Sequence, residues 1–271
     1  MTLFRRLLAP LLVGLAATLA TVSSAWAAPF QLGFALDGSG SVSTSNYNLL
    51  RSGLSNAMAA IPADGTIEIT VVTYGSSVST VVSPTILTAA SLQGIQVNIV
   101  NHTKAGGGTN TAAAIDSLTA LMTGSSVFQE PDVTSIINLA TDGFPNSQSA
   151  AEASAQAAAA AGIDALSIEA IGSGVASQSA LSNLSQIAFP DPVSILGVNT
   201  TNIPNPLNGS FVVPISDFNS LEPVILAKVI ASVTPNPDPT RVPVPGTLPL
   251  FLIGTLIAAL RSGRMTVRAA V

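Results

Sequence analysis

Apolar runs and helix-like spacings alternate along the central part of the chain. Short stretches of consecutive apolar residues are typical of buried strands, and they cover residues 31–36, 67–74, 78–82, 133–139, 163–171 and 210–213. In the segments between them apolar residues recur every three or four positions, which predicts helices over residues 43–60, 87–100, 111–122, 147–161, 179–187 and 216–232. Prolines and asparagines between residues 189 and 208 indicate an irregular excursion.

This alternation of strands and helices favours an α/β domain over residues 28–233. Parallel strands need crossover helices, and right-handed crossovers place those helices on both faces of the sheet. Gly75 and Ser76 separate two strands without a helix between them, which predicts a hairpin. We therefore expect a Rossmann-like, doubly wound, mostly parallel sheet. In such folds ligands bind beyond the carboxyl ends of the strands, at the point where strand order reverses.

The N-terminal end of the chain has the features of an export signal. Residues 1–27 hold a basic pair at Arg5-Arg6, an apolar run and a small-x-small cleavage pattern that ends at Ala27. We predict a signal peptide, with an uncleaved membrane anchor as the alternative.

The C-terminal end predicts a linker and a membrane-associated helix. Residues 234–245 carry five prolines, typical of a stiff linker, and residues 246–264 form an apolar stretch followed by a basic tail. This order resembles the PEP-CTERM sorting signal of Gram-negative bacteria, through residues Val242, Pro243, Pro245, Arg261 and Arg264. The family usually has glutamate where this chain has Val244. The resemblance implies inner-membrane anchoring and then cleavage by an exosortase-type enzyme. A plain, permanent anchor is the alternative, and both place the domain at the cell surface or outside the cell.

The charge balance excludes several functions. Between residues 28 and 240 the basic residues are Arg51, Lys104 and Lys228, against all 14 acidic ones, a net charge of −11. Such a surface cannot neutralise a run of phosphates, so we expect no nucleic-acid partner. The chain has no cysteine and a single histidine, His102, so neither a disulfide framework nor a zinc cluster of Cys and His ligands can form. The sequence also contains no nucleophile elbow and no phosphate-binding loop, and we expect no enzyme.

Three polar loops follow or precede the apolar elements. Asp37, Ser39 and Ser41 alternate with glycines directly after the first strand. A glycine run at residues 106–108 leads into Thr109 and a helix, and Asp142 follows the strand at residues 133–139. Each loop alone is typical of an ordinary turn.

Together these loops resemble the metal-ion-dependent adhesion site (MIDAS) of von Willebrand factor A domains. The resemblance covers about residues 30–232 and implies a site for Mg²⁺ or Mn²⁺ built from Asp37, Ser39, Ser41, Thr109 and Asp142. It implies direct coordination by the serine hydroxyls, direct or water-mediated coordination by the threonine, and aspartates that act largely through waters. Hydroxyl ligands leave the ion electrophilic, so that an open position can accept a partner's carboxylate.

The glycines of these loops also have a predicted role. We expect Gly38 and Gly40 to let the first loop turn tightly, and the glycine run at 106–108 to allow close backbone approach.

The expected function is an exported binding or adhesion module. Its partner is either a protein that offers an acidic residue or a polysaccharide. The alternatives are a structural matrix or biofilm component in which the metal only stabilises the fold, and a domain that keeps the fold without metal.

Overall fold

The structure is a computed structural model that describes residues 29–234. The predicted signal peptide, linker, C-terminal hydrophobic helix and sorting motif fall on residues 1–28 and from 235 onward, outside the described residues, and they stay predictions. Within residues 29–234 no helix has both the length and the apolar character needed to cross a membrane.

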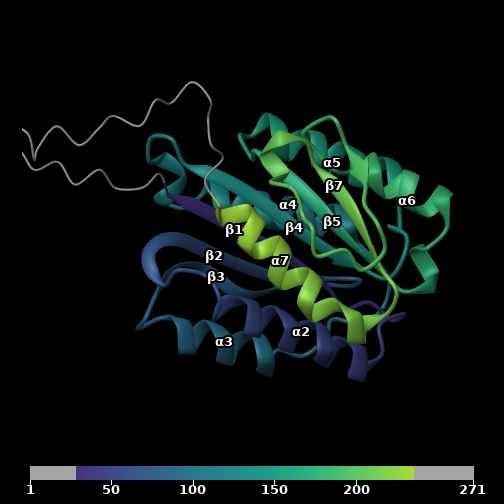
Figure 1. Cartoon of the computed structure of the whole chain (residues 1–271), viewed down its shortest axis with the longest axis horizontal. Coiled ribbons are helices and arrows are strands. Elements are labelled where there is room, and N and C mark those ends of the chain that lie inside the picture. The colour runs from purple at the N-terminus through teal and green to yellow at the C-terminus, as the bar shows by residue number, and fades with distance from the viewer. Residues whose placement is uncertain (1–28, 235–271) are drawn as a thin grey trace, which may run out of the picture. The chain divides into compact units, whose positions relative to one another are not determined.

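A seven-stranded sheet forms the centre of the domain (Figure 1). Its strands are β1 (Phe30–Asp37), β2 (Asp64–Tyr74), β3 (Val78–Thr88), β4 (Thr134–Thr141), β5 (Ala165–Ile171), β6 (Ser194–Ile195) and β7 (Phe211–Ile215). They lie in the order β3-β2-β1-β4-β5-β7-β6. All neighbours pair in parallel except β2 and β3, which form the predicted antiparallel hairpin. The predicted doubly wound α/β fold is confirmed.

Helices cover both faces of this sheet (Figure 1). They are α2 (Thr44–Met58), α3 (Leu92–Asn101), α4 (Thr111–Thr123), α5 (Gln148–Ala160), α6 (Gln178–Ser185) and α7 (Leu221–Val233). One apolar core joins the sheet to α2, α3 and α7, and a second joins it to α4, α5 and α6. Because both faces are covered, seven of the eight residues of β1 and of β4 are buried, which explains their continuous apolar runs.

Two predicted helices begin five residues too early: the last one, predicted from residue 216, begins as α7 at Leu221, and the other error concerns the boundary between β3 and α3. We predicted a strand that ends at residue 82 and a helix that begins at 87, whereas β3 continues to Thr88 and α3 begins at Leu92. The strand passes through Pro84 because β3 lies at the edge of the sheet, where a missing backbone N–H leaves no partner unpaired. The hydroxyl of Ser91 then closes the turn by donating to the carbonyl of Ile86 at 2.6 Å.

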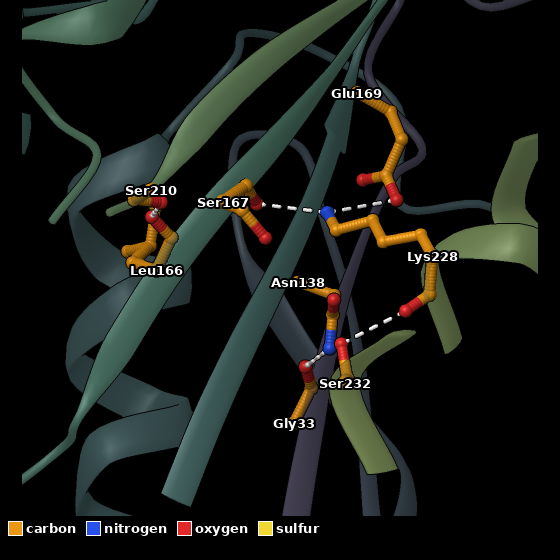
Figure 2. A network of polar contacts seen from close by, with 8 residues as sticks. All are labelled: Gly33, Asn138, Leu166, Ser167, Glu169, Ser210, Lys228 and Ser232. Carbon is orange, nitrogen blue, oxygen red and sulfur yellow. Dashed lines mark hydrogen bonds and ion pairs between the residues drawn. The ribbon is translucent and has the colours of Figure 1, made fainter. Parts of the chain in front are cut away.

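A buried polar network lies between α7 and the sheet (Figure 2). The Lys228 ammonium on α7 donates to the backbone carbonyl of Ser167 on β5 at 3.0 Å and forms an ion pair with Glu169. One turn further along α7, the Ser232 hydroxyl donates to the Lys228 carbonyl at 2.9 Å. These contacts anchor the last helix to the middle of the sheet.

The strand order reverses next to β1, and this positions the functional site. The chain leaves β1 for β2 on one side and later returns to β4 on the other side. A crevice therefore opens at the carboxyl ends of β1 and β4. Asp37 is the last residue of β1, and Asp142 directly follows β4.

Candidate functional site

The first loop begins with a buried carboxylate. Asp37 and Ser39 are both about as inaccessible as the apolar core, with exposed fractions of 1% and 0%. The backbone N–H of Ser39 donates to Oδ1 of Asp37 at 2.9 Å, and the Thr141 hydroxyl at the end of β4 donates to Oδ2 at 2.7 Å. Both carboxylate oxygens are thus fixed by hydrogen bonds from two different strand ends.

A chain of hydroxyls links the first loop to the third. The Oγ atoms of Ser39 and Ser41 lie 2.9 Å apart, and the Ser41 hydroxyl donates to Oδ1 of Asp142 at 2.6 Å. The two loops are 101 residues apart in sequence, so this contact exists only because β1 and β4 are neighbours in the sheet.

Thr109 lies against the same two loops. A Cβ atom built on Gly143 would be 3.6 Å from the Thr109 hydroxyl oxygen and 3.7 Å from that of Ser41, so both hydroxyls face the residue after Asp142. Asn146 holds the threonine in place, since its side-chain oxygen accepts from the Thr109 N–H and its own N–H donates to the Thr109 carbonyl, both at 2.8 Å. All five residues predicted for the metal site therefore meet at one end of the sheet.

Backbone hydrogen bonds join the first loop to the glycine run. Gly106 donates to the carbonyl of Gly38 at 2.6 Å, and Gly40 donates to the carbonyl of Gly107 at 2.7 Å. Gly106 and Gly107 have φ angles of +75° and +74°, which favour glycine. Gly38 and Gly40 have no positive φ, so the turn of the first loop does not depend on the left-handed region at these two positions. They are needed for close approach, because a Cβ on Gly40 would lie 3.1 Å from the carbonyl oxygen of Gly107.

Three residues of the site were not predicted from the sequence: Thr141, Asn146 and Lys104. The Lys104 ammonium donates to the carbonyl of Ser39 at 3.0 Å and also to that of Val42, which fixes the first loop from behind. For Lys104, the one signal in the sequence is that basic residues are rare in the central region, where it is one of three.

Burial raises the pKa of the Asp37 carboxyl above its usual 3.8. Hydrogen bonds from Ser39 and Thr141 offset part of this rise, and the nearby carboxylate of Asp142 adds to it. The cause is that burial removes water from a negative charge. A cation held beside this carboxylate would compensate the charge, so the site favours a positive ligand.

The donor set fits a hard divalent cation. Every side-chain donor is an oxygen, which suits Mg²⁺ or Mn²⁺ better than metals that select nitrogen or sulfur. Neighbouring ligands of an octahedral Mg²⁺ lie about 3.0 Å apart for Mg–O bonds near 2.1 Å, and this is close to the 2.9 Å between the two serine hydroxyls. In residues 29–234 no group of three or more His, Cys, Asp or Glu side chains could hold a metal.

A groove of about 420 Å³ opens beside this site. Ser41 and Asp142 form one wall, and Asn46 and Asp217 contribute further polar groups. Nearby, Phe144 is 50% exposed only two residues after Asp142. A large exposed aromatic next to an open polar groove is typical of a contact surface.

Solved structures share this fold at low sequence identity. Proximal thread matrix protein 1 (PTMP1) from the mussel byssus, solved with a zinc-occupied MIDAS motif, aligns with a TM-score of 0.54 and 19% identity over 76% of this chain and 46% of that one. The pilus adhesin SpaC from Lactobacillus rhamnosus GG, in its open conformation, aligns with a TM-score of 0.56 and 14% identity. The alignment covers 76% of this chain and 30% of that one. BatB from Bacteroides thetaiotaomicron aligns with a TM-score of 0.52 and 15% identity, over 74% of this chain and 97% of that one.

The chain spans less than half the length of the mussel and Lactobacillus proteins. No curated protein sequence matches it. The family model for the von Willebrand factor type A domain matches residues 31–202, which is more than half of the chain. That stretch contains β1, β4 and all three loops of the site. On the fold, the sheet order and this match, the chain belongs to the von Willebrand factor type A domain family.

Proposed function

We propose that this domain is a metal-dependent adhesion module that uses a bound Mg²⁺ or Mn²⁺ to recognise an acidic group on a protein partner. The observation that carries the proposal is the hydroxyl chain from Ser39 through Ser41 to Asp142, at the carboxyl ends of two adjacent strands. Structural relatives support it, since one is described with a zinc-occupied MIDAS motif and another is a pilus adhesin.

The residues of the chain have distinct tasks in this proposal. Ser39, Ser41 and Thr109 would hold the ion through their hydroxyls. The Asp142 carboxylate orients the Ser41 hydroxyl, the Asp37 carboxylate holds the backbone N–H of Ser39, and both would balance the charge of the ion. When bound, the ion supplies an electrophilic position that a carboxylate from outside can occupy. The groove beside Asp142 leaves room for the partner.

We infer a binding role rather than catalysis. The Asp37 carboxylate accepts from Ser39 and Thr141, and Asp142 accepts from Ser41, so both acids are engaged in holding the site. A general base must be able to reach a substrate proton, and the Asp37 carboxylate is too deeply buried to do so.

A second candidate is a structural matrix component, in which the ion only stabilises the fold. The observation in its favour is the likeness to a thread matrix protein. A polysaccharide partner is a further variant of the adhesion proposal. Under the adhesion proposal and under the matrix role alike, we place the domain outside the cytoplasm, on the basis of the predicted signal peptide and sorting signal.

The first test is a titration of the full chain with Mg²⁺ and with Mn²⁺, followed by calorimetry and thermal melting. We expect saturable binding and a higher melting temperature for the wild type, and neither for Asp142→Asn. Asp116→Asn is the matched control, because it removes the same charge from an exposed position on α4. No response of the wild type up to millimolar cation would exclude the metal site.

The second test separates adhesion from a matrix role. Partner binding should disappear in Asp142→Asn under the adhesion proposal. Assembly into a matrix that persists in this variant would favour the structural role instead.

A further inference from the structure

A second pocket has no lining residue in common with the groove. It has a volume of about 480 Å³, and its walls include Arg51, His102 and Lys104 together with Thr44, Tyr47 and Val100. We call this site the basic pocket. It lies where the start of α2 meets the segment that follows α3.

The basic pocket gathers nearly all of the positive charge of the described domain. Residues 29–234 contain three basic and 13 acidic side chains. Lys228 is fully buried in its ion pair. The other two, Arg51 and Lys104, both line this pocket, as does the single histidine, and no acidic side chain lines it. On a surface of strong negative charge, this pocket is where an anion would bind.

The basic pocket is connected directly to the metal site. Lys104 donates to the carbonyl of Ser39 at 3.0 Å and to that of Val42, so a residue that lines the pocket also supports the loop that presents Ser39 and Ser41 to the ion. One partner segment could therefore reach both sites at once.

Arg51 is held ready for a ligand. Its two terminal nitrogens donate to the carbonyl of His102 and to the side-chain oxygen of Asn48, and its guanidinium lies over the Tyr47 ring at 5.1 Å. Its Nε is buried and has no hydrogen-bond partner. A guanidinium fixed in this way loses little side-chain freedom when it binds a planar anion such as a carboxylate.

We propose that the basic pocket binds a second carboxylate of the same acidic protein segment whose first carboxylate reaches the ion. The inference rests on the proposed function and specifies the partner as a polypeptide with two acidic groups. One guanidinium and one ammonium match a single anionic group rather than a polyanion. Tyr47 is only 2% exposed, so its ring offers no surface for a sugar to stack on, and this favours an acidic peptide over an acidic polysaccharide.

The test measures binding of poly-L-glutamate to the full chain, with Mg²⁺ and with a chelator. The variant is Arg51→Gln, and Arg51→Lys keeps the charge but loses the planar fork. Gln156→Glu is the matched control, because it shifts the net charge by the same amount at an exposed position of α5, on the opposite face of the sheet. In Mg²⁺ we expect Arg51→Gln to weaken binding about three- to tenfold, Arg51→Lys less, and Gln156→Glu less than about twofold.

Several outcomes would overturn the inference. Equal affinities of Arg51→Gln and Gln156→Glu would do so while leaving the metal-dependent function intact. A parallel loss of Mg²⁺ affinity in Arg51→Gln would show that Arg51 acts through the first loop. Binding of polygalacturonate in place of poly-L-glutamate tests whether the partner is an acidic polysaccharide. If Arg51→Gln weakens polygalacturonate binding more than poly-L-glutamate binding, the peptide is ruled out as the partner. Binding that needs neither Mg²⁺ nor Asp142 would instead contradict the proposed function.

Discussion

The ammonium nitrogen of Lys228 lies 2.8 Å from Oε1 of Glu169, in an ion pair that no solvent reaches. Burial lowers the pKa of Lys228 and raises that of Glu169, and the attraction between the two charges opposes both shifts. The pair connects α7 to β5 across the apolar core that joins that helix to the sheet (Figure 2). Charges in such a place stabilise the fold only as a pair.

We therefore predict a strongly non-additive response to substitution of this pair. Lys228→Met alone should lower the free energy of unfolding by about 3–5 kcal/mol, because it leaves the Glu169 charge buried without a partner. Lys228→Met combined with Glu169→Leu should recover most of this loss, because the double variant has no charge left to bury at this place. Denaturant unfolding of the two single variants and the double variant measures the coupling. A double variant as unstable as Lys228→Met would contradict the prediction.

Asp37 should show a conflict between stability and function. In the metal-free chain, Asp37→Asn removes a buried negative charge while its amide can keep the hydrogen bonds with Ser39 and Thr141, so we expect stability at neutral pH to rise by about 0.5–2 kcal/mol. The same variant should lose the rise in melting temperature that Mg²⁺ produces in the wild type. Thermal melting with cation and with chelator tests both statements. A fall in metal-free stability would show that the buried charge of Asp37 does not destabilise the metal-free fold.

The raised pKa of Asp37 also predicts how Mg²⁺ affinity depends on pH. The ion requires the ionised carboxylate, so affinity should fall as the pH decreases toward the raised pKa, earlier than for an acid with the usual 3.8. In the metal-free chain the sign is opposite. Because the folded state has the higher pKa, the contribution of Asp37 to stability is fully present below 3.8 and is lost as the pH rises through the raised value.

Both signs can be checked in one series of measurements. Calorimetric titration with Mg²⁺ from about pH 7 down toward the usual carboxyl pKa of 3.8 gives the affinity, and melting of the metal-free wild type against Asp37→Asn isolates the contribution of this residue. An affinity that begins to fall no earlier than an acid with the usual pKa would predict would contradict the assignment of Asp37.

Gly107 should be more sensitive to substitution than Gly94, a glycine in helix α3. Its φ is +74°, and a Cβ would lie 2.1 Å from the Ser76 hydroxyl oxygen. Gly107→Ala should therefore lower stability by about 1–3 kcal/mol and weaken Mg²⁺ binding by shifting the first loop. Gly94→Ala in α3 is the control, since a Cβ there meets nothing within 4 Å and alanine favours a helix, so stability should rise by about 0.5–1 kcal/mol.

The fold could be predicted largely from sequence because its main signals are local. Strands buried on both faces appear as continuous apolar runs, and serine caps mark helix starts, as at Ser43, whose hydroxyl accepts from the N–H of Asn46. The strand β6, with two residues, has no such signal and lies inside the segment predicted as irregular. Its pairing with β7 is decided by contacts between distant segments.

The five candidate metal-site residues could be predicted from the sequence, but the residues that hold their surroundings in place could not. The order of Asp37, Ser39 and Asp142 after apolar strands indicated their proximity, because parallel strands end at the same edge. Lys104 contacts the first loop through backbone carbonyls, which carry no sequence signature. Lys228 lies on the apolar face of its helix although lysine is usually exposed to solvent, and only the structure pairs it with Glu169.

The backbone bonds among the three loops bear on how quickly and reversibly a cation could bind. Gly40 is bonded to Gly107, Gly106 to Gly38, and Asn146 to Thr109, so each loop is hydrogen-bonded to the next through the chain's own backbone. A cation that enters such a site has little chain disorder to remove, and its coordination energy is not consumed by ordering the backbone. The domain should thus keep the same loop conformation through repeated cycles of cation loss and uptake, which makes the ion an exchangeable contact and not a folding requirement.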